Sequence, residues 1–328
     1  MAEIWSIGGG KGGTGKSFLT GNLGVLLARH GLRTLLIDAD LGAANLHTLL
    51  GLPHPDISLS DFINKNVQTL SETVLETPIP NLFLISGARN KLDVANLGYG
   101  QKTRMLRAIS GLDYHTILLD LSSGTSFNTL DFFTLSDSGI FVCCPELTSI
   151  ENLYGLIRSV YLRKIRQVLK LHPFLKLAER AEERNPEAII NRPERLLDLL
   201  KEIDSEKGHL IEQILQGFRF RLVMNQVRKQ DSPEMGILIC RIVERHLGLK
   251  LRFLGNIAFD EHVRDHLRKK GPFVDAFPCC RTAMDLNALS KRMVGTTPAE
   301  IPSFIRPDSP KTLCREDHRE ETDRAELL

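Results

Sequence analysis

The sequence predicts an α/β fold, with a mostly parallel, twisted sheet covered by helices on both faces. Short apolar runs bounded by turn residues alternate with longer stretches of helical periodicity, which is the rhythm of β-α-β units. Most of the runs are continuously apolar, as strands are when both faces of a parallel sheet are buried. The expected strands are EIWSI, RTLLIDAD, NLFLIS, HTILLDL, SGIFVCCP, RFRLVMNQV and KLRFLGNIA.

The first helix is expected from Phe18 to His30. Its leucines recur at helical spacing on one face, and Gly31 follows as the kind of residue that ends a helix. A glycine-rich segment joins this helix to the strand EIWSI. The N-terminus of the helix is therefore expected to open directly from a glycine-rich loop.

A long connection precedes the strand RFRLVMNQV. About seventy residues separate the strand that ends at Pro145 from the one that starts near Phe218, more than a helical crossover needs. We interpret the stretch at about 163–215 as a helical insertion, because it is too short for an independent core. A helix of about twenty residues covers about 30 Å, so the insertion should lie at the end of the sheet opposite the glycine-rich loop. Helices are expected over 151–170, 174–184, 193–203 and 208–216.

Residues 1–300 are expected to form one domain, followed by a disordered charged tail over 301–328. The tail combines prolines and charges with few apolar residues, so it has little to bury. The whole chain is 42% hydrophobic and 25% charged, as ordinary globular proteins are. Its net charge of +2 gives no whole-chain basis for binding nucleic acid.

The lack of targeting signals and the pattern of the cysteines both indicate a cytoplasmic protein. The N-terminus lacks the basic and apolar regions of a signal peptide, and no uncharged apolar stretch is long enough for a transmembrane segment. Two adjacent cysteine pairs, Cys143-Cys144 and Cys279-Cys280, have neither a metal-binding spacing nor a secreted disulfide pattern. We interpret Cys143 and Cys144 as buried thiols without chemistry.

The glycine-rich segment GKGGTGKS satisfies the pattern G-x-x-x-x-G-K-[ST] between a strand and a helix, as a phosphate-binding P-loop requires. Backbone amides of such a loop surround phosphates, and the helix N-terminus adds partial positive charge. Lys16 would neutralise the β- and γ-phosphates, and the Ser17 hydroxyl would bind Mg²⁺. The expected nucleotide contacts are Gly10, Lys11, Gly12, Gly13, Thr14, Gly15, Lys16, Ser17 and Phe18.

The additional lysine of this loop, Lys11, makes GKGGTGKS resemble the deviant Walker A motif of the MinD/ParA ATPases. The resemblance implies a P-loop NTPase fold that binds ATP and Mg²⁺ and forms a homodimer with ATP. It further implies that Lys11 reaches phosphates bound by the other subunit, which makes Lys11 and Lys16 candidate catalytic residues. A surface lysine without a role is the alternative for Lys11.

The segment LLIDADLGAANLHTLLG resembles switch I of the same family. Asp38 and Asp40 stand at the carboxyl end of a strand, where open α/β sheets bind ligands. The resemblance implies that Asp40 orients the attacking water and that Asp38 acts on the Mg²⁺ shell together with Ser17. Alternatively, the two aspartates cap the next helix.

The segment HTILLDLSSGTSFNTLD resembles switch II of the family. Asp120 ends an apolar strand and would serve as a Walker B-type carboxylate, both a metal ligand and a candidate catalytic residue. Gly124 would move when the γ-phosphate is present. Leu121 and Ser122 stand where many relatives carry proline or glycine, which leaves the local shape of the switch open.

The adenine side is expected downstream. Asn225 and Arg228 in RLVMNQVRKQ match the adenine-side N-x-x-R signature of the family, and the amide of Asn225 can donate to and accept from an adenine edge. The stretch LGNIAFDEHVRDHLRKKGPF resembles MinD and FlhG, with FlhG the most similar subfamily. The resemblance covers roughly 3–160 and 218–295. It does not extend to an N-terminal activation helix, a basic amphipathic C-terminal helix or the helical insertion.

Together these observations predict an ATPase switch that acts in spatial organisation, either in flagellar placement, as FlhG does, or in cell-division or polar positioning. The partner would belong to flagellar or division machinery, and could bring this cytoplasmic protein to a membrane or pole.

One alternative is a ParA-type segregation ATPase that binds DNA non-specifically, because residues 152–178 carry basic residues and no acid. A solvated helix face is the simpler interpretation of that stretch. The basic residues of 152–178 are Arg158, Arg163, Lys164, Arg166, Lys170 and Lys176. A nucleotide-binding adaptor without significant turnover is a further alternative.

Overall fold

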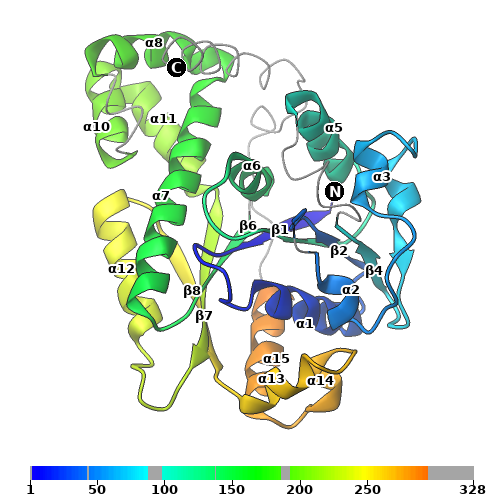
Figure 1. The fold of residues 1–328 in the computed structure, drawn as a ribbon. Helices are drawn as coiled ribbons and strands as arrows, with labels where there is room; N and C mark the ends of the chain where they lie inside the picture. The colour runs from blue at the N-terminus through cyan, green and yellow to red at the C-terminus, as the bar shows by residue number, and fades with distance from the viewer. Residues whose placement is uncertain (1, 43, 88–97, 137, 186–192, 295–328) are drawn as a thin grey trace, which may run out of the picture.

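The computed structural model describes all residues except 1, 43, 88–97, 137, 186–192 and 295–328. Within this part of the chain, eight strands form one sheet in the order β3-β4-β2-β5-β1-β6-β7-β8 (Figure 1). All neighbours are parallel except β3 and β4, which are antiparallel. The strands are β1 (Glu3–Gly8), β2 (Thr34–Asp38), β3 (Leu75–Glu76), β4 (Leu82–Ile85), β5 (Thr116–Asp120), β6 (Ser138–Cys143), β7 (Arg219–Val227) and β8 (Leu251–Ala258).

Every strand expected from the apolar runs is present, and the predicted α/β class is confirmed. The short edge strand β3 was not predicted, because two residues are too few to carry a period-2 pattern. It pairs antiparallel with β4 and forms a short outer edge of the sheet. The tail expected over 301–328, and the last residues of the expected domain, lie outside the described residues.

Two apolar cores lie on the two faces of the sheet, as the continuous apolar strands require. One face is covered by α1 (Lys16–Arg29), α2 (Leu46–Leu49), α14 (Phe273–Ala276) and α15 (Arg281–Val294), with α13 (Glu261–His266) beside them. The other is covered by α3 (Leu59–Ile63), α5 (Tyr99–Ser110), α6 (Phe127–Leu135), α7 (Leu147–Leu169) and α12 (Met235–Leu247). Short 3₁₀ turns occur at η1 (Leu70–Thr73) and η2 (His172–Phe174).

Helix α1 begins at Lys16, two residues before the expected start, and its leucines are buried as predicted. Gly15 precedes it in the left-handed conformation, with φ of 87°. Gly31 follows it, also left-handed with φ of 84°, because a residue without Cβ reverses the chain there at little cost. No helix in the described ranges is long and apolar enough to cross a bilayer.

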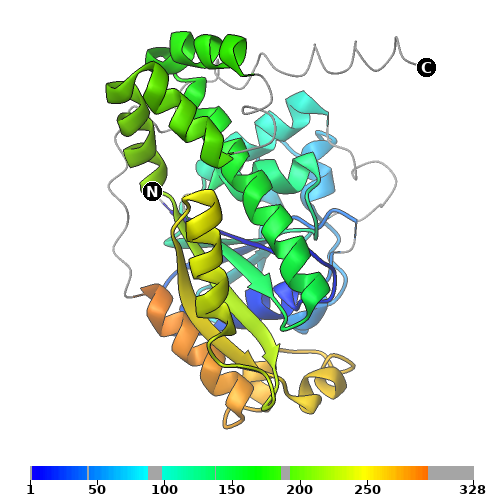
Figure 2. The same cartoon turned by 90° about the vertical axis from the view of Figure 1, so that its left-hand side faces the viewer.

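Among the described residues of the helical insertion, α8 (Leu175–Arg184), α10 (Pro193–Ile203) and α11 (Ser205–Gln216) follow α7, and we call these three helices the helical lobe. Helix α7 leaves the carboxyl end of β6 and, with 23 residues, extends about 34 Å. Figures 1 and 2 show the helical lobe at its far end, from which β7 begins. The predicted location away from the glycine-rich loop is therefore confirmed.

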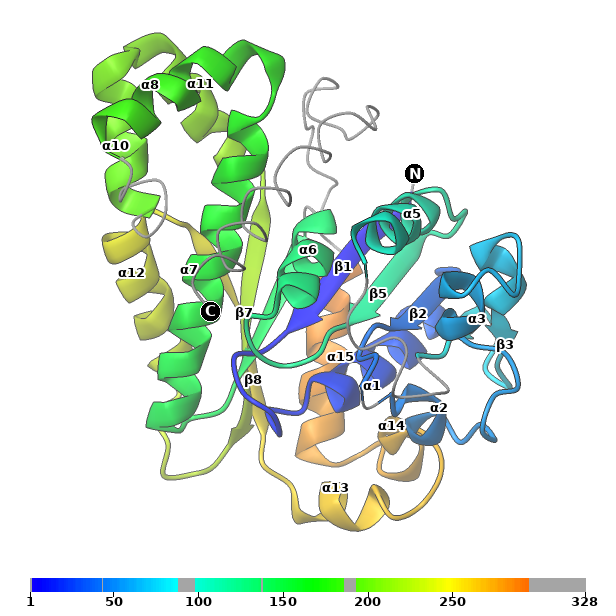
Figure 3. The same ribbon diagram turned by 45° about the horizontal axis from the view of Figure 1, so that its top comes forward.

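The helical lobe is packed against the sheet core rather than around a core of its own. Leu177, Leu200 and Ile211 are buried in the same apolar cluster as the residues of α7 and β6. α10 also contacts α12, the neighbouring helix over the sheet. Figure 3, in which the top of the view in Figure 1 comes forward, shows α10 next to α12. This continuity agrees with an insertion within one domain, an assignment that stays a proposal.

Candidate functional site

The P-loop turns between β1 and α1 by means of two left-handed glycines, Gly13 with φ of 79° and Gly15 with φ of 87°. Gly10 is required for a different reason. A Cβ on Gly10 would lie 2.2 Å from the backbone carbonyl of Asn152, because the first turns of α7 press directly against the loop. The glycine spacing therefore reflects both the turn itself and close contact with α7.

Lys16 extends from the first residue of α1 toward two carboxylates. Its side chain is buried, and burial lowers the pKa of Lys16. The negative charges of Asp120 and Asp40 oppose that shift. An ammonium enclosed in this way has few water molecules to lose when it meets an anion, which suits it to the phosphates that the motif predicts.

Asp120 ends β5 and is almost completely buried. Burial raises its pKa to about 6. The Thr20 hydroxyl hydrogen-bonds to its carboxylate at 3.1 Å, and the hydroxyls of Ser17 and Thr20 both favour the ionised form. Ser17 and Thr20 lie three residues apart on α1 and so share one helix face.

Asp38 lies beside Asp120, because β2 and β5 pair with these two residues in register. Both of its carboxylate oxygens accept backbone N–H groups from the following loop: Asp40 at 3.2 Å, Asn45 at 2.8 Å and Leu46 at 3.0 Å. Burial raises the pKa of Asp38 to about 8, with Asp120 adding to the effect and the three hydrogen bonds opposing it. Since Asn45 and Leu46 begin α2, Asp38 makes the helix-capping contact that was the alternative interpretation.

The predicted metal ligands Ser17 and Asp120 face each other with oxygen donors. Such donors fit Mg²⁺, which prefers oxygen and retains several waters, so that one or two protein ligands are enough. In the described part of the chain no group of three or more His, Cys, Asp or Glu side chains forms a metal site. The role of Asp38 in the Mg²⁺ shell stays a prediction.

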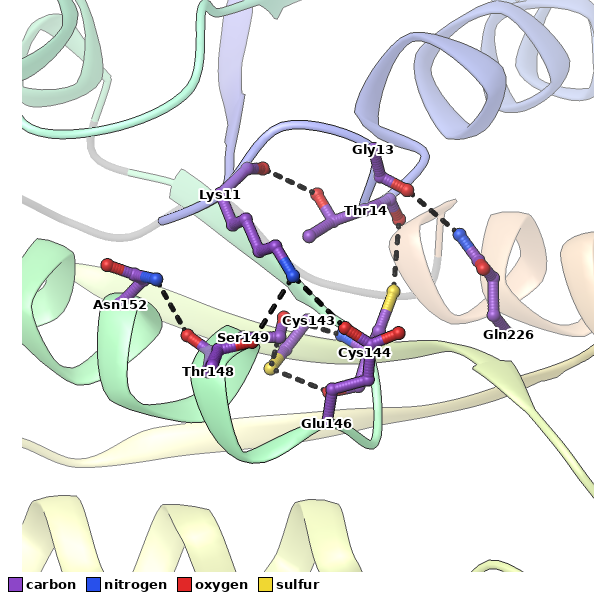
Figure 4. Close-up of polar contacts among 10 residues, drawn as sticks. All are labelled: Lys11, Gly13, Thr14, Cys143, Cys144, Glu146, Thr148, Ser149, Asn152 and Gln226. Carbon is purple, nitrogen blue, oxygen red and sulfur yellow. Dashed lines mark hydrogen bonds and ion pairs between the residues drawn. The ribbon is translucent and has the colours of Figure 1, made fainter.

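Lys11 is paired within its own chain (Figure 4). Its Nζ lies 3.2 Å from Glu146 Oε2 and 3.2 Å from Thr148 Oγ1, at the N-terminus of α7. Thr148 also accepts a hydrogen bond from Asn152 through its backbone carbonyl. No sequence pattern indicated Glu146 or Thr148, because only the fold brings the start of α7 to the P-loop.

Asn225 and its neighbour Gln226 hold the P-loop from β7. Asn225 Nδ2 donates to the carbonyl of Thr14 at 2.8 Å, and Gln226 Nε2 donates to that of Gly13 at 3.0 Å. Figure 4 shows the contact of Gln226 with Gly13. One of the two N–H groups of the Asn225 amide is thus engaged, and the other N–H and the oxygen remain for a base. Gln226, with φ of 60°, was missed by sequence reasoning.

Arg228 is stacked on Phe259, with its guanidinium carbon 3.9 Å from the ring centroid. The contact brings the end of β7 to the segment after β8, as expected for one side of a base pocket. Neither the Asn225 nor the Arg228 contact identifies a base directly, so both adenine assignments stay predictions.

Switch II touches the P-loop despite its departures from the family pattern. The Gly124 backbone N–H donates to the Gly9 carbonyl at 3.1 Å, and Gly124 is left-handed with φ of 88°. Leu121 is buried, and the Ser122 hydroxyl lies 2.8 Å from the Thr129 hydroxyl of α6. The substituted positions therefore connect the switch to the sheet and to α6.

A profile of the CobQ/CobB/MinD/ParA nucleotide-binding domain matches residues 5–273. The chain belongs to this family. The antiactivator FleN of Pseudomonas aeruginosa is 24% identical over 294 residues, which cover 89% of this chain and 86% of FleN. The septum site-determining protein MinD of Synechocystis is 29% identical over 178 residues, covering 53% of this chain and 66% of that protein.

Solved structures from the same family share the fold. MinD from Pyrococcus horikoshii, complexed with Mg-ADP, superimposes with a TM-score of 0.61 at 20% identity, covering 89% of this chain and 96% of that one. MinD in the MinC:MinD complex of Aquifex aeolicus gives a TM-score of 0.57 at 19% identity, covering 90% and 97%. The resemblance to MinD/ParA proteins predicted from the motifs is thus confirmed.

Proposed function

We propose that this member of the family is an ATPase switch, which binds Mg-ATP, forms a homodimer, and hydrolyses ATP to release a partner. The convergence of Lys16, Ser17 and Asp120 on the P-loop carries the proposal. These residues come from α1 and β5, and the proposal is supported by the electrostatic effects of Asp120 and Lys16 on each other and of the Ser17 hydroxyl on Asp120. A positive charge, a hydroxyl and a carboxylate in one buried corner are what a triphosphate with Mg²⁺ requires.

Each residue would have a distinct part in phosphoryl transfer. The P-loop amides and Lys16 would hold the β- and γ-phosphates, while Ser17 and Asp120 would hold Mg²⁺. Bound Mg²⁺ would neutralise phosphate charge. Asp40 would orient the attacking water, and Asp38 would hold the backbone of the switch I loop in place through the hydrogen bond to Asp40 N.

Lys11 would complete the site of the other subunit. Its side chain is 44% exposed, and its partner Glu146 is 62% exposed. An ion pair so open to solvent contributes at most about 1 kcal/mol, so the lysine can leave it for a phosphate, which carries more charge. A loop residue on the surface beside the phosphate site is positioned for contact across an interface.

The biological role we propose is spatial organisation, in line with relatives named as an antiactivator and as septum site-determining proteins. We infer that the protein works in the cytoplasm and reaches a membrane or pole through a partner from flagellar or division machinery. The helical lobe is the part of the chain that departs from the common family form, which favours it as the partner-docking region.

We favour non-specific DNA binding less than the sequence alone would, because two of the basic side chains have partners within the protein. Of the basic residues in 152–178, Arg163 pairs with Asp131, its NH2 atom 2.6 Å from Oδ1. Lys164 is buried and donates to the carbonyls of Thr134 and Ser136. Both charges serve the packing of α7 against α6, and they are not available to phosphates.

Sedimentation with and without saturating Mg-ATP tests the proposal, using wild type and Asp40→Ala. We expect a monomer-to-dimer shift for both proteins, with phosphate release only by wild type. Two proteins that stay monomeric would contradict the switch. ATP binding and dimerisation without phosphate release by wild type would instead support the adaptor, and an ATP-dependent shift of DNA at low salt would favour the ParA-type alternative.

A further inference from the structure

Thr20 lies behind the carboxylate of Asp120, on the side of α1 that faces the sheet. It is fully buried, and its hydroxyl donates to Asp120 Oδ1 at 3.1 Å. The two residues are 100 positions apart in the chain. Thr20 is absent from the P-loop pattern and from the nucleotide contacts expected from the sequence.

The Thr20 hydroxyl has two acceptors for one hydrogen. Besides Asp120, the carbonyl of Lys16 lies 2.9 Å from Thr20 Oγ1, one helical turn earlier. A hydroxyl bonded only to that carbonyl would make an ordinary contact within the helix, of the kind that threonines in helices often make. The second contact, to a buried carboxylate, is stronger because its acceptor is ionised, and it has no such local explanation.

Asp120 depends on few hydrogen-bond donors. Its carboxylate lies in a buried environment, where an oxygen without a donor is costly. Ser17 is the other hydroxyl that favours its ionised form, and the proposed function commits the Ser17 oxygen to Mg²⁺. Thr20 approaches from inside the protein and does not compete for the metal, so it can hold the carboxylate with the metal present or absent.

We propose that Thr20 is a positioning residue for Asp120, and that its hydroxyl sets how tightly the site holds Mg²⁺. The proposal rests on the proposed function, since it needs Asp120 to be a Mg²⁺ ligand. Groups that orient a metal ligand typically change metal affinity by about tenfold to a hundredfold when removed. Thr20 would act on Mg²⁺ without touching the nucleotide.

The test compares Thr20→Val, which keeps the shape and removes the hydroxyl, with Thr20→Ser, which keeps the hydroxyl. The control is Thr73→Val. Thr73 is fully buried, and its hydroxyl donates to the Leu70 carbonyl at 2.8 Å. In the sequence, Thr73 is far from every carboxylate of the candidate site. The measurement is the dissociation of fluorescent mant-ADP as a function of Mg²⁺ concentration, and again in EDTA.

For Thr20→Val we expect the Mg²⁺ midpoint to rise about tenfold or more, with mant-ADP affinity in EDTA unchanged. Thr20→Ser and Thr73→Val should stay within about twofold of wild type, since an intact hydroxyl or a remote site leaves the ligand oriented. A Thr20→Val midpoint equal to wild type would overturn the proposal. An equal loss of affinity in EDTA would also overturn it, because the effect would then be general damage to the P-loop.

Failure of the proposed function would look different. A folded wild-type protein that binds no mant-ADP at any Mg²⁺ concentration would contradict nucleotide binding itself. If wild type binds with a clear Mg²⁺ dependence and Thr20→Val leaves it unaltered, only the role of Thr20 is wrong. Should Thr20→Val not fold, judged by circular dichroism, Thr20→Ala carries the same expected midpoint shift and the same overturning results.

Discussion

Lys11 Nζ lies 3.2 Å from Glu146 Oε2, although 135 residues separate the two in the chain. The pair joins the P-loop to the first turn of α7, and Thr148 Oγ1 provides a second contact to the same ammonium. A lysine that must reach a neighbouring subunit would first have to leave this pair. The contact therefore competes with the proposed dimer.

We expect Glu146→Gln to favour ATP-dependent dimerisation, because it weakens the contact that holds Lys11 in its own subunit. An exposed pair contributes at most about 1 kcal/mol, so the apparent dimer dissociation constant should fall by up to about fivefold. Sedimentation at graded protein concentrations measures it. Glu151→Gln, an exposed neighbour on α7, is the control. A weaker dimer would indicate that Glu146 itself contacts the partner subunit.

Lys16→Ala should abolish nucleotide binding, whereas Lys11→Ala should leave binding by the monomer nearly intact. Loss of charged hydrogen bonds to two phosphates predicts a decrease in affinity of more than about a hundredfold for Lys16→Ala. Lys11→Ala should instead prevent dimerisation and turnover. Titration calorimetry gives the affinity, with exposed Lys250→Ala as the control. An equal loss in both lysine variants would place Lys11 in the site of its own chain.

Asp40→Ala should bind ATP and persist as a dimer while phosphate release falls by about 10² to 10⁴, the usual contribution of a group that positions or deprotonates a water. Asp40 hydrogen-bonds to Asp38 Oδ1 through its backbone N–H, which alanine retains, so the switch I loop should keep its shape. A coupled phosphate assay measures the rate. Turnover equal to wild type would move the catalytic role to another residue.

Leu200→Ala should lower the stability of the whole protein, because Leu200 is fully buried in the cluster shared by the helical lobe and the sheet. The expected loss is about 2–5 kcal/mol in a single denaturation transition. Leu210→Ala, on the exposed side of α11, should cost much less. Two transitions, with only the first affected, would make the helical lobe a separate folding unit and contradict the single-domain proposal.

Cys144 should resist alkylation in the folded protein. Burial raises the pKa of Cys144 to about 12, so at pH 8 almost none of it is thiolate, the form that reacts. Exposed Cys279 should react first with iodoacetamide, as mass spectrometry of peptides would reveal. Because the folded pKa lies above the unfolded value, reactivity should increase only as pH approaches 12 or as the protein unfolds. Early labelling of Cys144 would contradict its burial.

Much of the fold could be predicted, because its signals are local. Strand burial leaves continuous apolar runs, helix ends carry glycine and proline, and the P-loop pattern lies within eight residues from Gly10 to Ser17. The expected strands and the helices of the insertion appear close to the predicted positions. The edge strand β3 was not predicted, since two residues leave no periodic signal.

The sequence by itself determined the α/β class, the P-loop and the residues that resemble the MinD/ParA switches, since each depends on chemistry within one short segment. The tertiary structure decided which distant groups meet. The pairing of β2 with β5 sets Asp38 beside Asp120, the pairing of β6 with β1 brings Glu146 at the start of α7 to Lys11, and the packing of α1 places Thr20 against Asp120. Such contacts depend on strand order and helix packing, which no local pattern encodes.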